Sequence, residues 1–300
     1  MVARECHHLA KAKITLGIAQ LNPHLGDLEA NFSQYEKYLQ QVRGQGLDVL
    51  VFPELSLTGY HLRDMVPAVA LRLDSPEMAR LKEFSRAVPF VAGLVEESPD
   101  YRFYNTAVYL AGGEIHHLHR KVYLPTYGMF DEQRYFARGE RICAFDAPFG
   151  RASLLVCEDL WHPSTAYLAA LDQALLIICP SSSPLRGISD GESQDDNARY
   201  WELLNRMYAE TFGLFVVYAN RVGFEDGVGF WGGSEIVDPF GRRLAKGRYY
   251  EEDLIMAELS LDTVRRKRIA SPLLRDENVD LTIRELARIR ERAEKKERPG

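Results

Sequence analysis

The strongest constraint on the fold is a series of short apolar runs that recur along the chain. They cover residues 14–20, 47–52, 89–96, 152–157, 174–179 and 214–220. Runs of this length that stay apolar at successive positions are typical of strands buried on both faces. Each run is far shorter than the roughly 18 apolar residues of a membrane span. The pattern therefore predicts covered sheets in a layered protein, and no membrane-spanning segment.

Amphipathic segments between these runs predict the covering layers. After Asp27, a predicted N-cap, apolar side chains recur every three or four residues and form one face of a helix. These side chains are Leu28, Phe32, Tyr35, Leu39 and Val42. Residues 106–121 are instead typical of two strands joined at Gly112-Gly113, an antiparallel hairpin. We therefore expect an α/β fold, a four-layer αββα sandwich of two mixed sheets with helices outside.

The length indicates a single domain over residues 1–300, because a chain of this size can bury one large core. We expect that core to span about 13–262. The rest, about 263–300, has few apolar residues and is predicted to be a polar arm with a charged helix.

Composition excludes several classes of protein. Apolar residues make up 46% of the chain, charged residues 27%, and the net charge is −6, as in ordinary soluble globular proteins. Basic residues gather only at 265–268 and 288–298, where the longer run alternates with acids, so we expect solvated helix faces and no nucleic-acid partner. Residues 1–20 carry charges and histidines where a signal peptide needs an unbroken apolar stretch, so we expect a cytoplasmic protein.

The cysteines indicate reduced thiols. They are widely spaced, with no C-x-x-C pair, which argues against both a disulfide framework and a zinc site. They are Cys6, Cys143, Cys157 and Cys179.

A histidine run at 116–119 suggests metal binding, but it lies in a predicted strand. There the alternation of side chains would place His117 and His119 on the same face as Ile115. We therefore expect no metal and no cofactor.

Four stretches place reactive side chains at or near the ends of predicted strands, where loops build sites. They are "PELSLTGY" (53–60), "RKVYLPTYGMFDEQRYF" (120–136), "CEDLWHP" (157–163) and "PSSSP" (180–184). Taken alone, Glu54 has the pattern of a solvated turn residue, Lys121 of a surface charge and Cys157 of an inert thiol. A thiol at the end of a strand can instead lie near backbone N–H groups that stabilise anions. The residues alone leave both explanations open.

In order, and over nearly the whole chain, these stretches resemble the nitrilase superfamily of carbon–nitrogen hydrolases. That family carries a Glu-Lys-Cys triad in P-E-x-x-x-x-G-Y, R-K-x-x-L-P and C-x-D-x-x-x-P motifs, which here read "PELSLTGY", "RKVYLP" and "CEDLWHP". Within the superfamily the chain is similar to the glutaminase domain of glutamine-dependent NAD synthetases, through "YLPTYGMFDEQRYF", "CEDLW" and "PSSSP". The pyrophosphate loop of those synthetases does not occur in this sequence. Their glutamine-binding arginine has no clear counterpart, because Arg186 comes early and Arg199 late.

The resemblance implies a role for each catalytic candidate. Glu54 would be the general base and Cys157 the nucleophile that becomes an acyl-enzyme. Lys121 and the backbone N–H of Glu158 would stabilise the oxyanion. Glu132 would lie near the lysine and help to position substrate.

The same resemblance implies the surroundings and the substrate. Tyr60, Tyr127 and Trp161 are candidates for pocket walls, each equally explained as core, and Ser182 is a candidate substrate-binding residue. The expected substrate is a small linear amide or N-carbamoyl compound, and the products are an acid and ammonia or an amine. A nitrile substrate is less favoured. In relatives the C-terminal tail packs across a dimer interface, so the arm is expected to contact another subunit of a homodimer or higher homo-oligomer.

Three other interpretations stay open. "WGGSE" (231–235) and "PSSSP" suggest a serine-dependent amidase, although the longer Gly-Ser-rich stretch and paired lysine of that class are missing. A glutaminase subunit that supplies ammonia to a separately encoded NAD synthetase would carry the same motifs. A catalytically dead scaffold is disfavoured because every member of the implied site is present.

Overall fold

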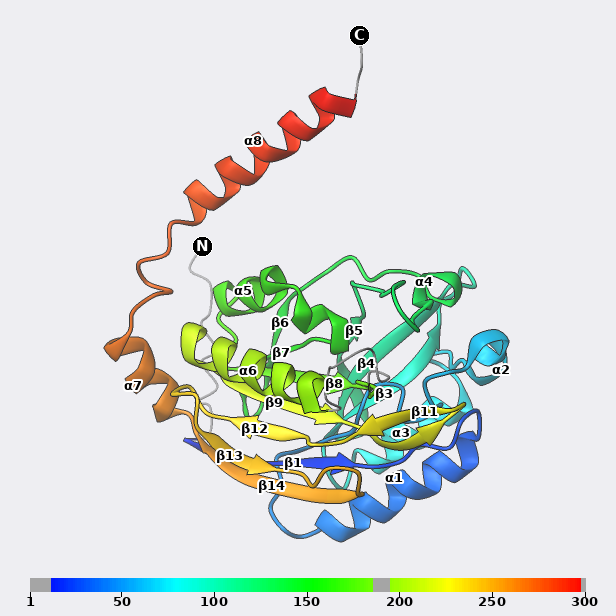
Figure 1. The fold of residues 1–300 in the computed structure, drawn as a ribbon. Coiled ribbons are helices and arrows are strands. Elements are labelled where there is room, and N and C mark those ends of the chain that lie inside the picture. Colours follow the sequence, from blue (N-terminus) through cyan, green and yellow to red (C-terminus); the bar gives the residue numbers. More distant parts are fainter. Residues whose placement is uncertain (1–11, 186–194, 298–300) are drawn as a thin grey trace, which may run out of the picture.

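The computed structural model describes residues 12–185 and 195–297, and its main body consists of two six-stranded sheets packed face to face (Figure 1). The first sheet contains, in spatial order, β14 (Asp253–Ser260), β1 (Lys13–Gln20), β2 (Val49–Val51), β3 (Phe90–Glu97), β4 (Phe103–Ala111) and β5 (Glu114–Arg120). The second contains β13 (Arg243–Lys246), β12 (Glu235–Val237), β9 (Phe215–Asn220), β8 (Leu176–Ser181), β7 (Gly150–Leu154) and β6 (Ala144–Ala147). A separate hairpin pairs β10 (Val222–Glu225) with β11 (Val228–Trp231).

Helices cover the outer faces of both sheets (Figure 1). The first sheet is covered by α1 (Leu28–Val42) and α3 (Pro76–Phe84), and the second by α5 (Pro163–Leu171) and α6 (Asp195–Phe212). Short helical turns lie in the connections: η1 (Arg63–Met65), α2 (Val66–Val69), α4 (Glu132–Tyr135) and η2 (Cys157–Trp161). The chain continues through α7 (Asp262–Ala270) and α8 (Val279–Glu297). The predicted four-layer αββα sandwich is confirmed.

Apolar side chains separate these layers. Between the sheets, residues such as Leu16, Val51, Leu154 and Ile178 form one fully buried cluster. A second cluster packs α1 and α3 on the first sheet, and a third packs α5 and α6 on the second. Because both faces of each sheet are buried, the central strands are apolar throughout, as the sequence shows.

The direction of the central strands brings the site together. β1, β2 and β3 run parallel to one another, and so do β7, β8 and β9, whereas the outer strands are antiparallel. Parallel strands end at the same edge of their sheet. Glu54 follows β2, Cys157 follows β7 and Ser181 ends β8, so the segments after these strands are placed to build one site.

Two local predictions are confirmed, the cap of the first helix and the antiparallel hairpin. The Asp27 side chain caps α1 by accepting a hydrogen bond from the Ala30 backbone N at 3.0 Å. The hairpin of residues 106–121 forms as β4 and β5. Cys143, Cys157 and Cys179 are free thiols, and Cys6 lies outside the described residues. In the described part of the chain no helix is long and apolar enough to cross a membrane.

The predicted arrangement of the histidine run is wrong for Ile115 alone: His117 and His119 share a face, as predicted, and Ile115 lies on the opposite face. β5 pairs Ile115 with Leu110 and His117 with Tyr109, so His116 is an extra residue in a β-bulge. The bulge turns Ile115 toward the helix layer, while His117 stacks on Phe145 between the sheets at 4.1 Å. Within residues 12–185 and 195–297, no group of three or more His, Cys, Asp or Glu side chains is arranged to hold a metal ion.

The C-terminal segment differs in part from a solvated arm. α7 packs on the body, where Val264 is 3% exposed and joins the core between the sheets. α8 projects away from the body (Figure 1). The compact part of the chain therefore extends through α7.

Candidate active site

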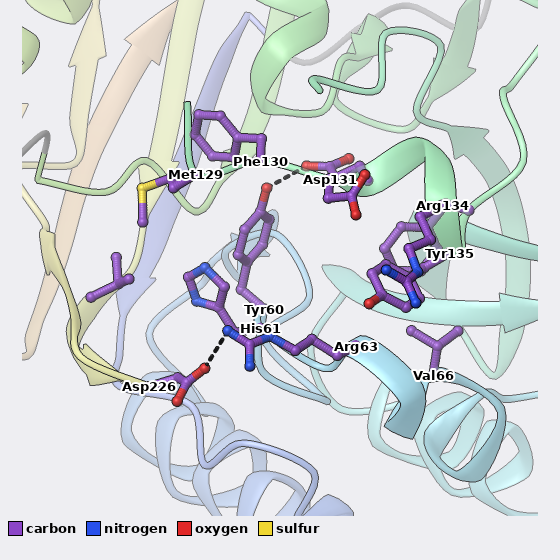
Figure 2. Close-up of a pocket in the computed structure, with 13 residues that line it drawn as sticks. Tyr60, His61, Arg63, Val66, Met129, Phe130, Asp131, Arg134, Tyr135 and Asp226 are labelled. Carbon is purple, nitrogen blue, oxygen red and sulfur yellow. Dashed lines mark hydrogen bonds and ion pairs between the residues drawn. The ribbon is translucent and has the colours of Figure 1, made fainter. Parts of the chain in front are cut away.

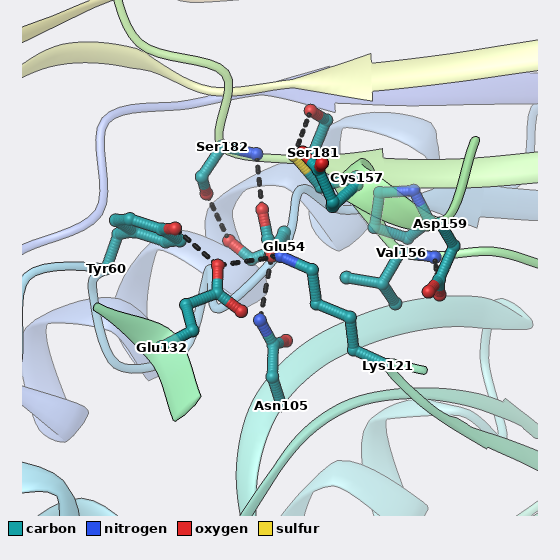
Figure 3. Close-up of polar contacts among 12 residues, drawn as sticks. Glu54, Tyr60, Asn105, Lys121, Glu132, Val156, Cys157, Asp159, Ser181 and Ser182 are labelled. Atoms are coloured by element: carbon teal, nitrogen blue, oxygen red, sulfur yellow. Dashed lines mark hydrogen bonds and ion pairs between the residues drawn. The ribbon is translucent and has the colours of Figure 1, made fainter. Parts of the chain in front are cut away.

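Glu54 lies in a tight turn after β2 that packs against β3. A side chain at Gly93 would place its Cβ 2.4 Å from the Pro53 carbonyl oxygen, so only glycine lets the turn approach. The carboxylate is fully buried. Its Oε1 accepts hydrogen bonds from Asn105 Nδ2 at 2.7 Å and Lys121 Nζ at 2.8 Å, and its Oε2 accepts one from the Ser182 backbone N at 2.7 Å. These donors hold both oxygens in place (Figure 3).

Lys121 follows β5 and is fully buried between two carboxylates. Its Nζ donates to Glu54 Oε1 and, at 2.7 Å, to Glu132 Oε1. Burial alone would lower the pKa of this ammonium, but the negative charges of Glu132 and Glu54 outweigh it and hold the pKa well above its ordinary value. The lysine therefore stays a cation at neutral pH.

Glu132 is the first residue of α4 and is also buried. Its Oε1 accepts hydrogen bonds from Lys121 and from the Tyr60 hydroxyl, whereas Oε2 has no hydrogen-bond partner in the described residues. Burial raises the pKa of this carboxyl to about 7; Lys121 opposes the rise and the charge of Glu54 adds to it. Glu132 can therefore exchange a proton near neutrality.

Cys157 begins η2 with φ of 45°, a left-handed conformation that is strained for a residue with a side chain. The Ser181 hydroxyl donates to its Sγ at 3.2 Å. Burial raises the pKa of the Cys157 thiol well above its ordinary value, and the Glu54 charge raises it further against the opposing effect of Lys121. The resting sulfur is therefore a thiol, and its nucleophilicity depends on a base.

Asp159 joins the turn of Cys157 to the segment that follows Lys121. Its Oδ1 accepts hydrogen bonds from the backbone N atoms of Val122 and Tyr123, both at 2.9 Å. Its Oδ2 accepts one from the Val156 backbone N at 3.0 Å and lies 2.8 Å from His119 Nε2. This fully buried carboxylate therefore sets the spacing between the cysteine and the lysine.

A cavity of about 530 Å³ adjoins this cluster. Tyr60 and Glu132 belong both to the cluster and to the cavity wall. The rest of the wall combines aromatic with charged side chains, among them Phe130, Arg134, Tyr135 and Asp226 (Figure 2).

The structure brings together six of the nine predicted site residues. Hydrogen bonds and charge interactions connect Glu54, Tyr60, Lys121, Glu132, Cys157 and Ser182. Ser182 reaches the cluster by holding Glu54: its backbone N binds the carboxylate and its hydroxyl donates to the Glu54 carbonyl oxygen at 2.9 Å.

The other three predicted residues are Glu158, which directly follows Cys157, and the aromatic residues Tyr127 and Trp161. The half-exposed Tyr127 donates its hydroxyl to the Glu158 carboxylate at 2.9 Å, and Tyr127 does not line the cavity. Trp161 stacks on Tyr200 of α6 at 4.3 Å, in the helix layer.

Sequence reasoning missed three members of the cluster: Asn105, Asp159 and Ser181. Asn105 lies just before the predicted hairpin of residues 106–121, where no pattern distinguished it, whereas Asp159 was signalled by its place in "CEDLWHP". Ser181 was one of three adjacent serines that no pattern distinguished.

A comparison with protein families matches residues 15–269 to the carbon-nitrogen hydrolase model, and the chain belongs to this family. Its relatives include a glutamine-dependent NAD(+) synthetase of Thermotoga maritima, 31% identical over 94% of this chain and 48% of the relative. Another is the chloroplastic omega-amidase of Arabidopsis thaliana, 28% identical over 90% of this chain and 73% of the relative. The chain spans about half the length of the synthetase.

A solved structure shows the same fold. The carbon-nitrogen hydrolase of Helicobacter pylori aligns with a TM-score of 0.83 and 25% identity, covering 91% of this chain and 98% of that structure. The resemblance to the nitrilase superfamily is thereby confirmed.

Proposed function

We propose that the protein is a thiol-dependent amidohydrolase that cleaves the C–N bond of a small linear amide or N-carbamoyl compound. The observation that carries this proposal is the buried ammonium of Lys121, which the carboxylates of Glu54 and Glu132 share and which interacts with Cys157. An amide needs a strong nucleophile for its carbon and a proton for its departing nitrogen. This cluster contains a group for each task.

In the first half of the reaction, Glu54 takes the proton of Cys157 while Sγ attacks the amide carbon. The C=O bond becomes a C–O⁻ single bond, and by the family resemblance the Lys121 ammonium and the Glu158 backbone N–H stabilise the new oxyanion. Glu54 then gives its proton to the nitrogen, the C–N bond breaks, and ammonia or an amine leaves. The product is a thioester on Cys157.

In the second half, Glu54 takes a proton from water as the water oxygen attacks the thioester carbon. The second oxyanion collapses, the C–S bond breaks, and the proton on Glu54 returns to Sγ. A carboxylic acid leaves, or a carbamic acid where the substrate is an N-carbamoyl compound. Lys121 keeps its charge throughout because its raised pKa keeps it protonated. A preorganised cation at the oxyanion stabilises both transition states.

Trapping of the acyl-enzyme tests the substrate class. We expect intact-mass spectrometry of the protein, quenched after mixing with a panel of linear amides and N-carbamoyl compounds, to show one adduct per chain on Cys157. The added mass identifies the acyl group. If the wild-type protein turns the substrate over at low temperature and no cysteine adduct appears at quench times shorter than one turnover, the covalent mechanism is wrong.

A second candidate function is that of a glutaminase subunit, which supplies ammonia to a separately encoded NAD synthetase. It is favoured by the synthetase relatives, which match nearly the whole of this chain with about half of their own length. The panel therefore includes glutamine, alone and with added NAD synthetase. Brisk turnover of simple amides with no adduct from glutamine supports the free-standing amidohydrolase, whereas a glutamine adduct stimulated by the synthetase supports the second candidate.

We also propose that α8 pairs with a second copy of the chain. Ile283, Leu286 and Ile289 recur every three residues on this helix and are 59%, 62% and 55% exposed. We expect light scattering to give at least a dimer for the wild type, and a smaller mass for the Leu286→Glu/Ile289→Glu double variant. Glu291→Lys, on the opposite face, is the control and should keep the wild-type mass. An unchanged mass in the double variant would exclude α8 from the interface.

A further inference from the structure

The β10–β11 hairpin contains a buried ion pair outside the catalytic cluster. Arg221, which precedes β10, has a fully buried side chain, and Glu225 at the end of β10 is 2% exposed. Arg221 Nη1 donates to Glu225 Oε2, and Nη2 donates to Asn22 Oδ1 at 3.2 Å. The guanidinium carbon also lies 4.1 Å from the centre of the Phe230 ring. Removing two charges from water is costly, so a buried ion pair is stable only where further hydrogen bonds satisfy both charged groups.

The other oxygen of Glu225 holds a segment far away in the sequence. Oε1 accepts hydrogen bonds from the backbone N atoms of Tyr60 at 2.8 Å and His61 at 2.5 Å. Gly59 makes this approach possible, because it has φ of 81° and a Cβ there would lie 3.0 Å from Glu225 Oε2. The hairpin therefore fixes the backbone from which the Tyr60 side chain extends.

The same hairpin also contacts the Tyr60 ring. Phe230 of β11 packs edge-on against it, with ring centres 6.2 Å apart and planes at 71°. The Tyr60 hydroxyl donates to Glu132 Oε1, which also accepts from Lys121 (Figure 3). A continuous series of contacts therefore runs from Arg221 through Glu225 and Tyr60 to Glu132. Figure 2 shows Tyr60 and His61 on one side of the cavity, near the hairpin residue Asp226.

We propose that the Arg221–Glu225 pair is a positioning unit of the active site, which holds Tyr60 so that its hydroxyl stays on Glu132. The inference rests on the proposed function, because that function uses the Lys121 ammonium that Glu132 shares. Arg221 and Glu225 act through Tyr60, as positioning residues.

The charge balance at Glu132 gives the inference a measurable consequence. The groups that face its carboxylate are Lys121, Glu54 and the Tyr60 hydroxyl. Burial is the main cause of its raised pKa, and the hydrogen bond from Tyr60 opposes that rise by favouring the ionised form. When Tyr60 moves away, this opposition is lost. The pKa of Glu132 should then rise further above about 7.

The experiment compares Tyr60→Phe, Glu225→Gln and the two combined. The titration of Glu132 is followed by carbon-13 NMR of labelled glutamate, assigned with Glu132→Gln, and the pH profile of kcat/KM is measured beside it. Tyr60→Phe should raise the pKa of Glu132 and lower kcat/KM by about 10- to 100-fold, the usual effect of a hydrogen bond to a charged group. Glu225→Gln should also raise the pKa of Glu132 and lower kcat/KM. The double variant should behave like Tyr60→Phe, because both changes remove the same hydrogen bond between Tyr60 and Glu132.

A matched control and a second variant separate positioning from general loss of structure. Glu251→Gln removes the carboxylate of an exposed pair with Arg248 and should leave the Glu132 titration unchanged. Arg221→Lys keeps the buried charge but loses the forked contacts to Asn22 and Glu225, and should shift the Glu132 titration in the same direction by a smaller amount. If Glu225→Gln does not fold, Arg221→Lys is the variant that tests the positioning role.

Two outcomes would overturn the positioning role. One is a wild-type Glu132 titration in folded Glu225→Gln or Arg221→Lys, and the other is a fully additive effect of Tyr60→Phe and Glu225→Gln. The NMR titration needs no turnover, so the proposed amidohydrolase mechanism can fail while this inference is still tested independently.

Discussion

Replacing Cys157 with alanine is expected to abolish hydrolysis, with kcat/KM lower by on the order of 10⁴-fold or more. The reason is that the proposed thioester cannot form without Sγ, and the remaining base and oxyanion donors activate water poorly. Steady-state turnover of the substrate found by the mass-spectrometry panel is the measurement. The variant should still bind that substrate, because the hydrogen bonds among Tyr60, Lys121 and Glu132 do not involve the thiol.

Cys179→Ala is the matched control. Cys179 is a fully buried thiol in the neighbouring strand β8, and burial raises its pKa above the ordinary value as it does for Cys157. It lacks the strained turn and the Ser181 hydroxyl that distinguish Cys157. We expect near wild-type activity and a small loss of stability. If both variants retain activity, the nucleophile lies elsewhere, and the serines of residues 180–184 become the next candidates.

The sequence could predict the strands and the catalytic cluster because both depend on local patterns. Each apolar run formed a buried strand, and Glu54, Lys121 and Cys157 lie just beyond strands in the segments that build the site. Their convergence follows from the topology, since parallel strands deliver their ends to the same edge. The family motifs then connected three positions that composition alone could not have related.

What could not be predicted depends on contacts between distant segments. The carboxylate of Glu225 accepts a hydrogen bond from the backbone N of Tyr60, 165 residues away in sequence. No spacing pattern in the sequence indicates a hydrogen bond over such a distance. The bulge at His116 turns Ile115 away from the face that His117 and His119 share, and a pattern of period two does not account for one extra residue. Trp161 and Tyr127 were predicted as walls because they are aromatic and near the motifs. Their positions were decided by packing on Tyr200 and by a bond to Glu158.

Replacing Lys121 with methionine should both inactivate and destabilise the protein. Methionine matches the length of the lysine stem but leaves the buried carboxylates of Glu54 and Glu132 without their shared cation. Breaking a buried ion pair by removing one partner typically costs about 3 to 5 kcal/mol of the free energy of unfolding. Loss of the oxyanion cation should lower kcat by roughly 10² to 10³-fold. Denaturant unfolding and steady-state kinetics measure the two effects.

The pH dependence of the stability loss identifies its cause. Lys121 opposes the burial that raises the pKa of Glu132 to about 7, so without the lysine that pKa rises further. A carboxyl group with a raised pKa in the folded state binds more protons than it does in the unfolded state, and stability then falls as pH increases. The deficit in Lys121→Met should therefore be larger at about pH 8.5 than at about pH 6. Lys267→Met is the control: this lysine is also buried, at 9% exposure, but lies near the Phe240 ring, so we expect a small, pH-independent change. An equal deficit at both pH values in Lys121→Met would mean that lost packing, and not the unpaired carboxylates, destabilises the variant.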